Sequence, residues 1–272
     1  MKKDKDVTII IPLYKPDKDL LKKVYESIKN QDYDGEIEIL TIEEGLGFGG
    51  TFNYGLKKSK YDILVSLHQD CVPSSNDWLK KLVEPLKNEN VVASVSKVEL
   101  PFVFWNKFDI IAKILSAKEQ AVLTPLLDQK GCANKKSAII ESGMFDTKHF
   151  ATAGEDFDMY IKFKKIGNIA YPDAKVIHYH KHTWKNRIKK ELQLSNGFGS
   201  LVRLHGNKMP NWYVGILKAI PLIGLPVFLA GSNVKKLKFL LIPAIPIYLF
   251  INLIYSFSFW KGFLSGRQTQ LI

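Results

Sequence analysis

The feature that most constrains this chain is a run of 22 residues without a charged side chain, from Phe239 to Trp260. As one helix it would be about 33 Å long, enough to cross the roughly 30 Å hydrocarbon core of a bilayer. We expect a transmembrane helix over 239–260, within a membrane-associated segment over 211–272. The preceding apolar stretch, 213–231, is broken by a lysine, two prolines and a glycine, so it could span, re-enter or lie on the membrane. A buried helical hairpin of a soluble domain is the alternative.

The charge distribution also indicates a membrane. The 272 residues have a net charge of +12, but residues 1–156 carry 22 basic and 24 acidic residues, so the excess lies entirely in 157–272. A basic protein can bind nucleic acid, yet here the basic region runs into the apolar tail, and an anionic membrane surface accounts for both features. We therefore expect a cell-membrane protein that has no nucleic-acid partner.

The N-terminus and the cysteines indicate the compartment. The first 16 residues have too short an apolar run for a signal peptide, so we expect the region before residue 211 on the cytoplasmic side. Only two cysteines are present, Cys71 and Cys132, which excludes a disulfide scaffold and favours a reducing compartment.

Before residue 211, segments with strand patterns alternate with segments of helical periodicity. We expect buried strands over 7–11, 36–42 and 61–67, and helices over 17–31 and 51–58. This order is typical of an α/β fold with a mainly parallel, Rossmann-like sheet. We therefore expect one domain over 1–210, of a type that binds nucleotides. Such sheets bind ligands at the carboxyl ends of their strands.

Carboxylates follow the second and third expected strands. Glu43 and Glu44 could accept hydrogen bonds from a base or a ribose, or could lie at a merely solvated strand end. Asp70 follows the third strand. The glycines of 45–50 match a dinucleotide-binding pattern, but they follow the second strand instead of the first, beside two carboxylates that would repel a pyrophosphate. We therefore do not expect NAD.

Three histidines alternate in the segment 174–183, and an extended backbone would place His178, His180 and His182 on one face. Imidazoles together with Asp70 are reasonable ligands for a divalent ion that also takes phosphate oxygens, although histidines exposed at a surface would show the same pattern.

Two adjacent carboxylates, Glu155 and Asp156, precede an expected helix over 156–165. They could cap that helix, or one of them could be a general base.

Taken in order, these segments resemble the family 2 glycosyltransferases, which have the GT-A fold, over about residues 6–205. The segment 7–16 resembles the family's first strand ending in P-x-Y-N, with Lys15 in place of asparagine, and 42–45 stands where the family has V-D-D-G. Residues 47–55 are similar to its glycine- and asparagine-containing stretch, and 134–146 followed by 154–156 to its acceptor-side segment and E-D motif. Gln69-Asp70-Cys71 replaces the usual D-x-D triplet, and this variant, with the later H-x-H, resembles the rhamnosyltransferase-like branch.

The resemblance implies an inverting glycosyltransferase that moves a hexose from a nucleoside-diphosphate sugar to a lipid-linked saccharide or surface glycan, as in polysaccharide biosynthesis. It implies Mg²⁺ or Mn²⁺ held by Asp70, His178 and His180, and a catalytic base at Asp156 with Glu155 beside it. The donor-binding residues that it implies are Pro12, Tyr14, Glu43, Glu44, Asn53, Gln69 and Asp70. Two alternatives remain: an inactive membrane scaffold with this fold, and a zinc-dependent hydrolase built on the H-x-H pair.

Overall fold

The computed structural model describes residues 4–43, 45–231 and 237–268, so the predicted donor-binding residue Glu44 lies outside the described residues. The chain divides into two compact units. Unit 1 comprises residues 1–100, 122–146 and 156–180, and unit 2 comprises 101–121, 147–155 and 181–272. This division does not coincide with the domain boundary expected at residue 210, because residues 181–210 fall in unit 2.

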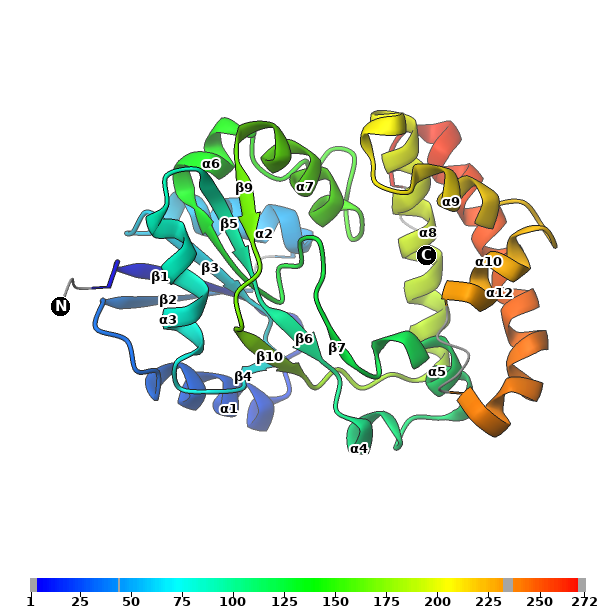
Figure 1. Ribbon diagram of the computed structural model, residues 1–272, viewed down its shortest axis with the longest axis horizontal. Coiled ribbons are helices and arrows are strands. Elements are labelled where there is room, and N and C mark those ends of the chain that lie inside the picture. The colour runs from blue at the N-terminus through cyan, green and yellow to red at the C-terminus, as the bar shows by residue number, and fades with distance from the viewer. Residues whose placement is uncertain (1–3, 44, 232–236, 269–272) are drawn as a thin grey trace. The chain divides into compact units, whose positions relative to one another are not determined.

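Unit 1 is built on a six-stranded mixed sheet with the order β2-β1-β3-β8-β5-β9 (Figure 1). Strand β1 pairs in parallel with both neighbours, β8 runs antiparallel between β3 and β5, and β5 pairs in parallel with β9. The expected α/β fold with a mainly parallel sheet is therefore confirmed. The strands are β1 (Val7–Pro12), β2 (Ile37–Ile42), β3 (Ile63–Leu67), β5 (Val91–Val95), β8 (Gly131–Lys135) and β9 (Asn168–Ala170).

Helices cover both faces of this sheet because its central strands are apolar on both sides. In β1, Ile9 and Ile11 belong to one buried cluster and Ile10 to the other. The first cluster takes in side chains of α1 and α3, and the second takes in side chains of α2, α6 and α7. These helices are α1 (Lys18–Lys29), α2 (Gly47–Lys58), α3 (Trp78–Val83), α6 (Lys136–Glu141) and α7 (Glu155–Ile166), and a 3₁₀ turn, η1 (Glu84–Lys87), follows α3.

The helix expected over 51–58 begins four residues earlier, at Gly47. Phe48 and Phe52 lie one turn apart and stack at 5.9 Å between ring centroids, and both pack in the second cluster. This apolar packing extends the helix through glycines that have low helix propensity. The first helix agrees with expectation: the Asp17 side chain caps it by accepting a hydrogen bond from the backbone N–H of Leu20 at 3.2 Å.

A second sheet of four short strands, also in unit 1, has the order β4-β10-β6-β7. Strand β10 runs antiparallel to β4 and parallel to β6. The strands are β4 (Cys71–Pro73), β6 (Lys97–Glu99), β7 (Val122–Leu123) and β10 (Lys175–His178). This sheet matters for function because it joins the end of β3 to a strand about a hundred residues further along the chain.

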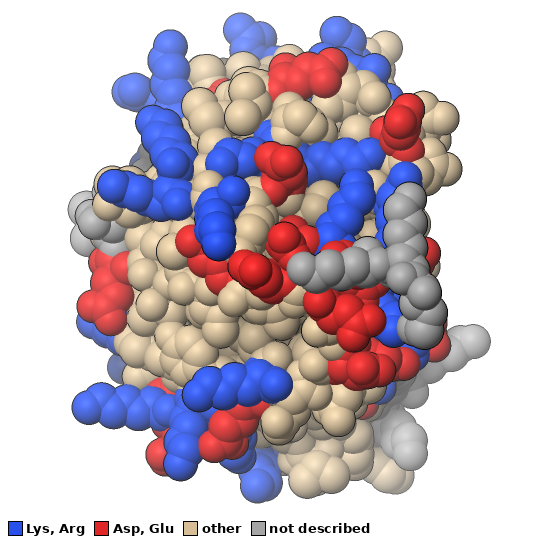
Figure 2. Space-filling model, turned by 90° about the vertical axis from the view of Figure 1, so that its left-hand side faces the viewer, with Lys and Arg blue, Asp and Glu red and all other residues tan. Residues whose placement is uncertain are grey.

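Ion pairs lie at the edge of unit 1 where β1 and β2 begin. Lys60 contacts Glu36, and Lys87 contacts both Asp4 and Glu84. Figure 2 shows both acidic and basic side chains on this side of the molecule. The face in that view therefore does not concentrate the positive charge of the chain.

Unit 2 is helical in its described part. Its α-helices are α4 (Phe102–Trp105), α5 (Ile110–Leu115), α8 (Trp184–His205), α9 (Trp212–Lys218), α10 (Gly224–Gly231) and α12 (Leu241–Ser265), with 3₁₀ turns η2 (Ala117–Glu119), η3 (Gly206–Lys208) and η4 (Lys238–Leu240). Helix α12 is, among the described residues, the one helix long and apolar enough to cross a membrane. It extends five residues beyond the uncharged run that suggested it, and it packs mainly against α8.

Candidate functional site

Asp70 lies in the turn that connects β3 to β4, at the carboxyl end of a buried strand. The antiparallel pairing of β10 with β4 places His178 opposite Cys71, the residue after Asp70. The backbone N–H of Tyr179 donates a hydrogen bond to the Asp70 carbonyl at 2.8 Å and holds the two segments together. Strand pairing therefore brings His178 and His180 to a carboxylate that is distant in the sequence.

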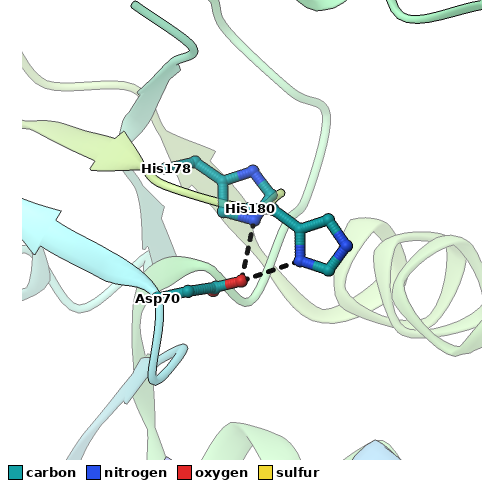
Figure 3. A group of neighbouring side chains, drawn as sticks. All are labelled: Asp70, His178 and His180. Carbon is teal, nitrogen blue, oxygen red and sulfur yellow. Dashed lines mark hydrogen bonds and ion pairs between the residues drawn. The ribbon is translucent and has the colours of Figure 1, made fainter. Parts of the chain in front are cut away.

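Both imidazoles point at the same carboxylate oxygen, as Figure 3 shows. Asp70 Oδ2 lies 3.4 Å from His178 Nε2 and 3.0 Å from His180 Nδ1. The two rings stack, with centroids 5.5 Å apart. The side chains of Asp70 and His178 are mostly buried, whereas that of His180 is 47% exposed, so the cluster opens to solvent on the His180 side.

The cluster favours an ionised carboxylate. Burial raises the pKa of Asp70, but the contacts with His178 and His180 lower it more, and the resulting pKa lies well below the usual range of a carboxyl group. Asp70 therefore carries a negative charge at every pH at which the protein is expected to work.

These three residues fit a divalent metal ion. Each offers one ligand atom, and the three atoms lie within 4.8 Å of one another. Two imidazole nitrogens and one carboxylate oxygen suit a transition ion such as Mn²⁺ or Zn²⁺ better than Mg²⁺, which prefers oxygen ligands throughout. The exposed side near His180 leaves room for ligand atoms from a bound molecule. All three residues predicted as metal ligands are thus brought together.

Sequence and structure comparisons define the fold. A profile of the family described as Glycosyl transferase family 2 matches residues 17–143, slightly under half of the chain. No curated protein matches the sequence. Among solved structures, a mannosyltransferase from Pyrobaculum calidifontis in complex with GDP-Man and Mn²⁺ is 16% identical, with a TM-score of 0.61, over 97% of this chain and 88% of that one. GalNAc-T7 with UDP, GalNAc and Mn²⁺ is 14% identical, with a TM-score of 0.57, over 88% of this chain and 55% of that one.

The chain has a GT-A-like fold. At these identities the similarity concerns the fold alone, and the site is described from the chain's own residues.

A partly buried ion pair that the sequence did not reveal adjoins the Asp70–His178–His180 cluster in unit 1. Lys130 Nζ lies 2.7 Å from Asp128 Oδ2. The charges of Lys130, Asp70 and Asp128 all affect the pKa of His68. Burial lowers the pKa of His68 to about 4, with repulsion from Lys130 adding to the effect, so this imidazole is neutral at pH 7. Burial opposes both charges of the pair, but their mutual attraction raises the pKa of Lys130 and lowers that of Asp128. An aspartate and a lysine in a loop carry no sequence signal that distinguishes them from surface residues.

Gln69, the residue before Asp70, binds the backbone of Tyr14. Its side-chain Nε2 donates to the Tyr14 carbonyl and its Oε1 accepts from the Tyr14 N–H, both at 2.8 Å. An ionised carboxylate at this position could not make both contacts, because it has no donor. Gln69 thus holds the backbone two residues beyond the end of β1 at Pro12, where Tyr14 is 75% exposed.

Asn53 forms the same kind of double contact elsewhere in the GT-A-like unit. Its Nδ2 donates to the Phe145 carbonyl at 2.9 Å, and its Oδ1 accepts from the Phe145 N–H at 3.1 Å. The amide therefore ties α2 to the segment after α6, and a contact with the donor stays a prediction. Glu43 is exposed just beyond the end of β2, where its carboxylate is open to a ligand.

The E-D pair lies at the start of α7, as expected, with Glu155 as the first helical residue. Burial raises the pKa of Cys132, and the charge of Asp156 adds to this effect. Asp156 also raises the pKa of Lys130, by less than Asp128 does, so this carboxylate lies within electrostatic reach of the Asp128–Lys130 pair. These electrostatic interactions link four titratable residues of unit 1: Asp156, Lys130, His68 and Asp70.

His182 does not join the other two histidines at Asp70, contrary to the expectation that all three would share one face. Its Nε2 lies 3.5 Å from Glu119 Oε2 within unit 2, and its ring packs edge-on against Phe108. The strand geometry that makes side chains alternate ends at His178, so the alternation does not extend to His182.

Proposed function

We propose that this chain is a family 2 glycosyltransferase that moves a hexose from a nucleoside-diphosphate sugar to a hydroxyl group of a lipid-linked acceptor, with inversion, at a membrane. The observation that carries the proposal is the Asp70–His178–His180 cluster at the carboxyl end of β3 in a GT-A-like fold. A cluster there can hold the diphosphate of a donor, because open α/β sheets bind their ligands at this edge.

The donor would lie along the strand ends. The exposed Tyr14 ring can stack on a nucleobase, and the exposed Glu43 carboxylate can accept hydrogen bonds from the base or the ribose. Asp70, His178 and His180 would hold Mn²⁺, which when bound offsets the charge of the leaving diphosphate. Lys130, held protonated by Asp128, adds a positive charge to the same neighbourhood.

The acceptor hydroxyl would lose its proton to the Asp156 carboxylate. Its oxygen would attack the anomeric carbon from the side opposite the diphosphate, forming the new glycosidic bond as the bond to the diphosphate breaks. One such displacement inverts the anomeric configuration. The charge balances because the nucleoside diphosphate leaves with the electron pair and the proton stays on Asp156.

A thermal-stabilisation screen of the full chain tests the proposal, with a panel of nucleotide sugars and with Mn²⁺, Mg²⁺ or Zn²⁺. We expect one donor to stabilise the protein in the presence of Mn²⁺ and to be consumed when an acceptor is added. Nucleotide-linked rhamnose and mannose are tested first. The Gln69-Asp70 variant favours rhamnose, and the similar structure in complex with GDP-Man favours mannose. His180→Ala should remove the stabilisation, whereas Asp173→Asn, at an exposed carboxylate of the same unit, should not.

Two results would overturn the proposal. Stabilisation by a donor without turnover on any acceptor would indicate an inactive scaffold. Tight binding of Zn²⁺ with hydrolysis that needs no nucleotide sugar would indicate a hydrolase, for which two histidines and a carboxylate are also a suitable ligand set.

A further inference from the structure

Helix α12 has two different faces. One face is buried and contains most of its polar side chains: Tyr248, Asn252, Tyr255, Ser256 and Ser258. The other is exposed and apolar, with Ile242 81%, Phe257 70% and Leu264 80% exposed. Six of the exposed large side chains of α12 are separated by three, four or eight residues and form one stripe along the helix: Ile242, Ile245, Leu253, Phe257, Trp260 and Leu264.

The buried face of α12 is bonded closely to α8. Ser258 Oγ donates to the Leu192 carbonyl at 2.7 Å, and Asn196 Nδ2 donates to the Ser258 carbonyl at 3.0 Å. A Cβ added to Gly262 would lie 2.0 Å from the Asn196 carbonyl oxygen, so the two backbones touch. Further along, the Arg203 guanidinium lies 5.8 Å from the Phe263 ring centroid. The two helices therefore run side by side over much of α12.

Helix α8 cannot accompany α12 through a bilayer. Lys189 and Lys190 are exposed on α8 next to the Leu192 contact, and Arg203 is exposed beside the far end of α12. Charged side chains are strongly disfavoured in hydrocarbon. Crossing without α8 would instead expose to lipid the polar groups of α12 that α8 now satisfies.

We propose that α12 lies along the surface of an anionic membrane, with its exposed apolar stripe among the lipid chains, and does not span the bilayer. Lipid is the occupant that the charge favours, because residues 181–272 contain 13 basic residues and one acidic residue. Trp260 belongs to the stripe and the exposed Lys261 follows it in the chain, and both residue types suit the interface between lipid and water. This inference does not depend on the reaction catalysed.

Labelling of the two ends of α12 distinguishes the surface from the spanning arrangement. Phe239→Cys and Ser265→Cys place thiols at exposed positions that flank the apolar stripe and are not part of it, while native Cys71 and Cys132 are buried. The full chain is synthesised in the presence of sealed vesicles that contain phosphatidylglycerol, and an impermeant maleimide is added outside. We expect both thiols to react, because both ends lie on the outer surface. Protection of one thiol until detergent is added would show that α12 spans, and would overturn the proposal.

A charged substitution in the stripe tests the lipid contact itself. Phe257→Asp should reduce binding to anionic vesicles by about tenfold or more, because it places a carboxylate where an aromatic ring meets lipid. Ile140→Asp is the matched control, because Ile140 is 55% exposed on α6 of unit 1. This variant should bind the anionic vesicles as the unsubstituted chain does. Leu264→Asp provides a second test at the end of the stripe. Unchanged vesicle binding in both stripe variants would overturn the proposal. It would also be overturned if the chain forms a dimer without detergent and the stripe substitutions dissociate that dimer, because a second copy would then cover the stripe.

Discussion

Gln268 binds Thr152 twice: its side-chain Oε1 accepts from the Thr152 N–H at 2.6 Å, and its Nε2 donates to Thr152 Oγ1 at 3.1 Å. The same Oε1 also accepts from the N–H groups of Ala151 and Ala153, at 2.9 and 3.1 Å. One side chain near the end of the described chain thus holds three consecutive backbone amides of unit 2. That segment continues directly into α7, which begins with Glu155 and Asp156.

Gln268→Ala should loosen the segment 151–153. Three backbone N–H groups would lose their acceptor, which should cost about 1–3 kcal/mol of local stability. We expect hydrogen exchange of these amides to accelerate by about tenfold or more. We also expect turnover to fall with donor affinity unchanged, because the helix start that carries Asp156 is less well held.

Gln268→Glu keeps the acceptor oxygen and should retain most of the amide protection, while it loses the donor to Thr152 Oγ1. Ser265→Ala, which removes an exposed hydroxyl three residues earlier, serves as the control. Equal exchange in Gln268→Ala and in the unsubstituted chain would show that other contacts hold the segment.

Asp156→Asn should abolish the general base of the proposed mechanism and lower kcat by at least about 10²-fold. The substitution is nearly isosteric, so we expect the donor to bind as before. Steady-state kinetics together with donor titration measure both quantities. If kcat is unchanged and Glu155→Gln loses activity instead, the base is Glu155.

Asp70 and His178 should act as one unit in donor binding. Their contact at 3.4 Å predicts that either Asp70→Asn or His178→Ala weakens donor affinity, and that the second substitution costs less in the presence of the first. A double-mutant cycle of donor affinities in Mn²⁺ measures this coupling. Strictly additive losses would place the two residues in separate sites.

The predictable parts of this structure are those that short stretches of sequence specify. The β-branched run of β1 predicts its strand, and Asp17 predicts the start of α1, because both signals are local. The Asp70–His178–His180 cluster could be predicted because carboxylates and imidazoles are common metal ligands. The family resemblance indicated which of these residues belong to one site.

The other parts depend on contacts between segments that are far apart in the sequence. The role of Gln69 follows from the position of the Tyr14 backbone, and that of Gln268 from the path of residues 151–153, neither of which a local pattern specifies. The uncharged run 239–260 indicates length and apolarity correctly, but the polar face that α12 presents to α8 appears only when the two helices are seen together.

A buried ion cluster in unit 2 predicts acid sensitivity. The Arg187 guanidinium contacts Glu119 and Glu191, each at 2.7 Å, and donates to the Leu115 carbonyl at 3.1 Å. Burial raises the pKa of Glu119, but the attraction of Arg187 and the contact with His182 lower it more, so the pKa lies well below its ordinary value. The cluster thereby joins η2 to the first turns of α8.

Glu119→Gln should therefore change how stability depends on pH. Because the folded pKa is depressed, the unfolded chain binds a proton at Glu119 more readily, and the stabilisation is complete above the ordinary glutamate pKa of about 4.3 and is lost as the pH falls below it. We expect the free energy of unfolding of the unsubstituted chain to decline between about pH 5 and pH 3, and that of Glu119→Gln to decline less. At pH 7 the variant should be less stable by about 3 kcal/mol, since a buried guanidinium loses one partner. Denaturant titrations in mild detergent at several pH values measure both effects, with Asp173→Asn as a control at an exposed carboxylate. Parallel curves for Glu119→Gln and the unsubstituted chain would assign the acid sensitivity to other groups.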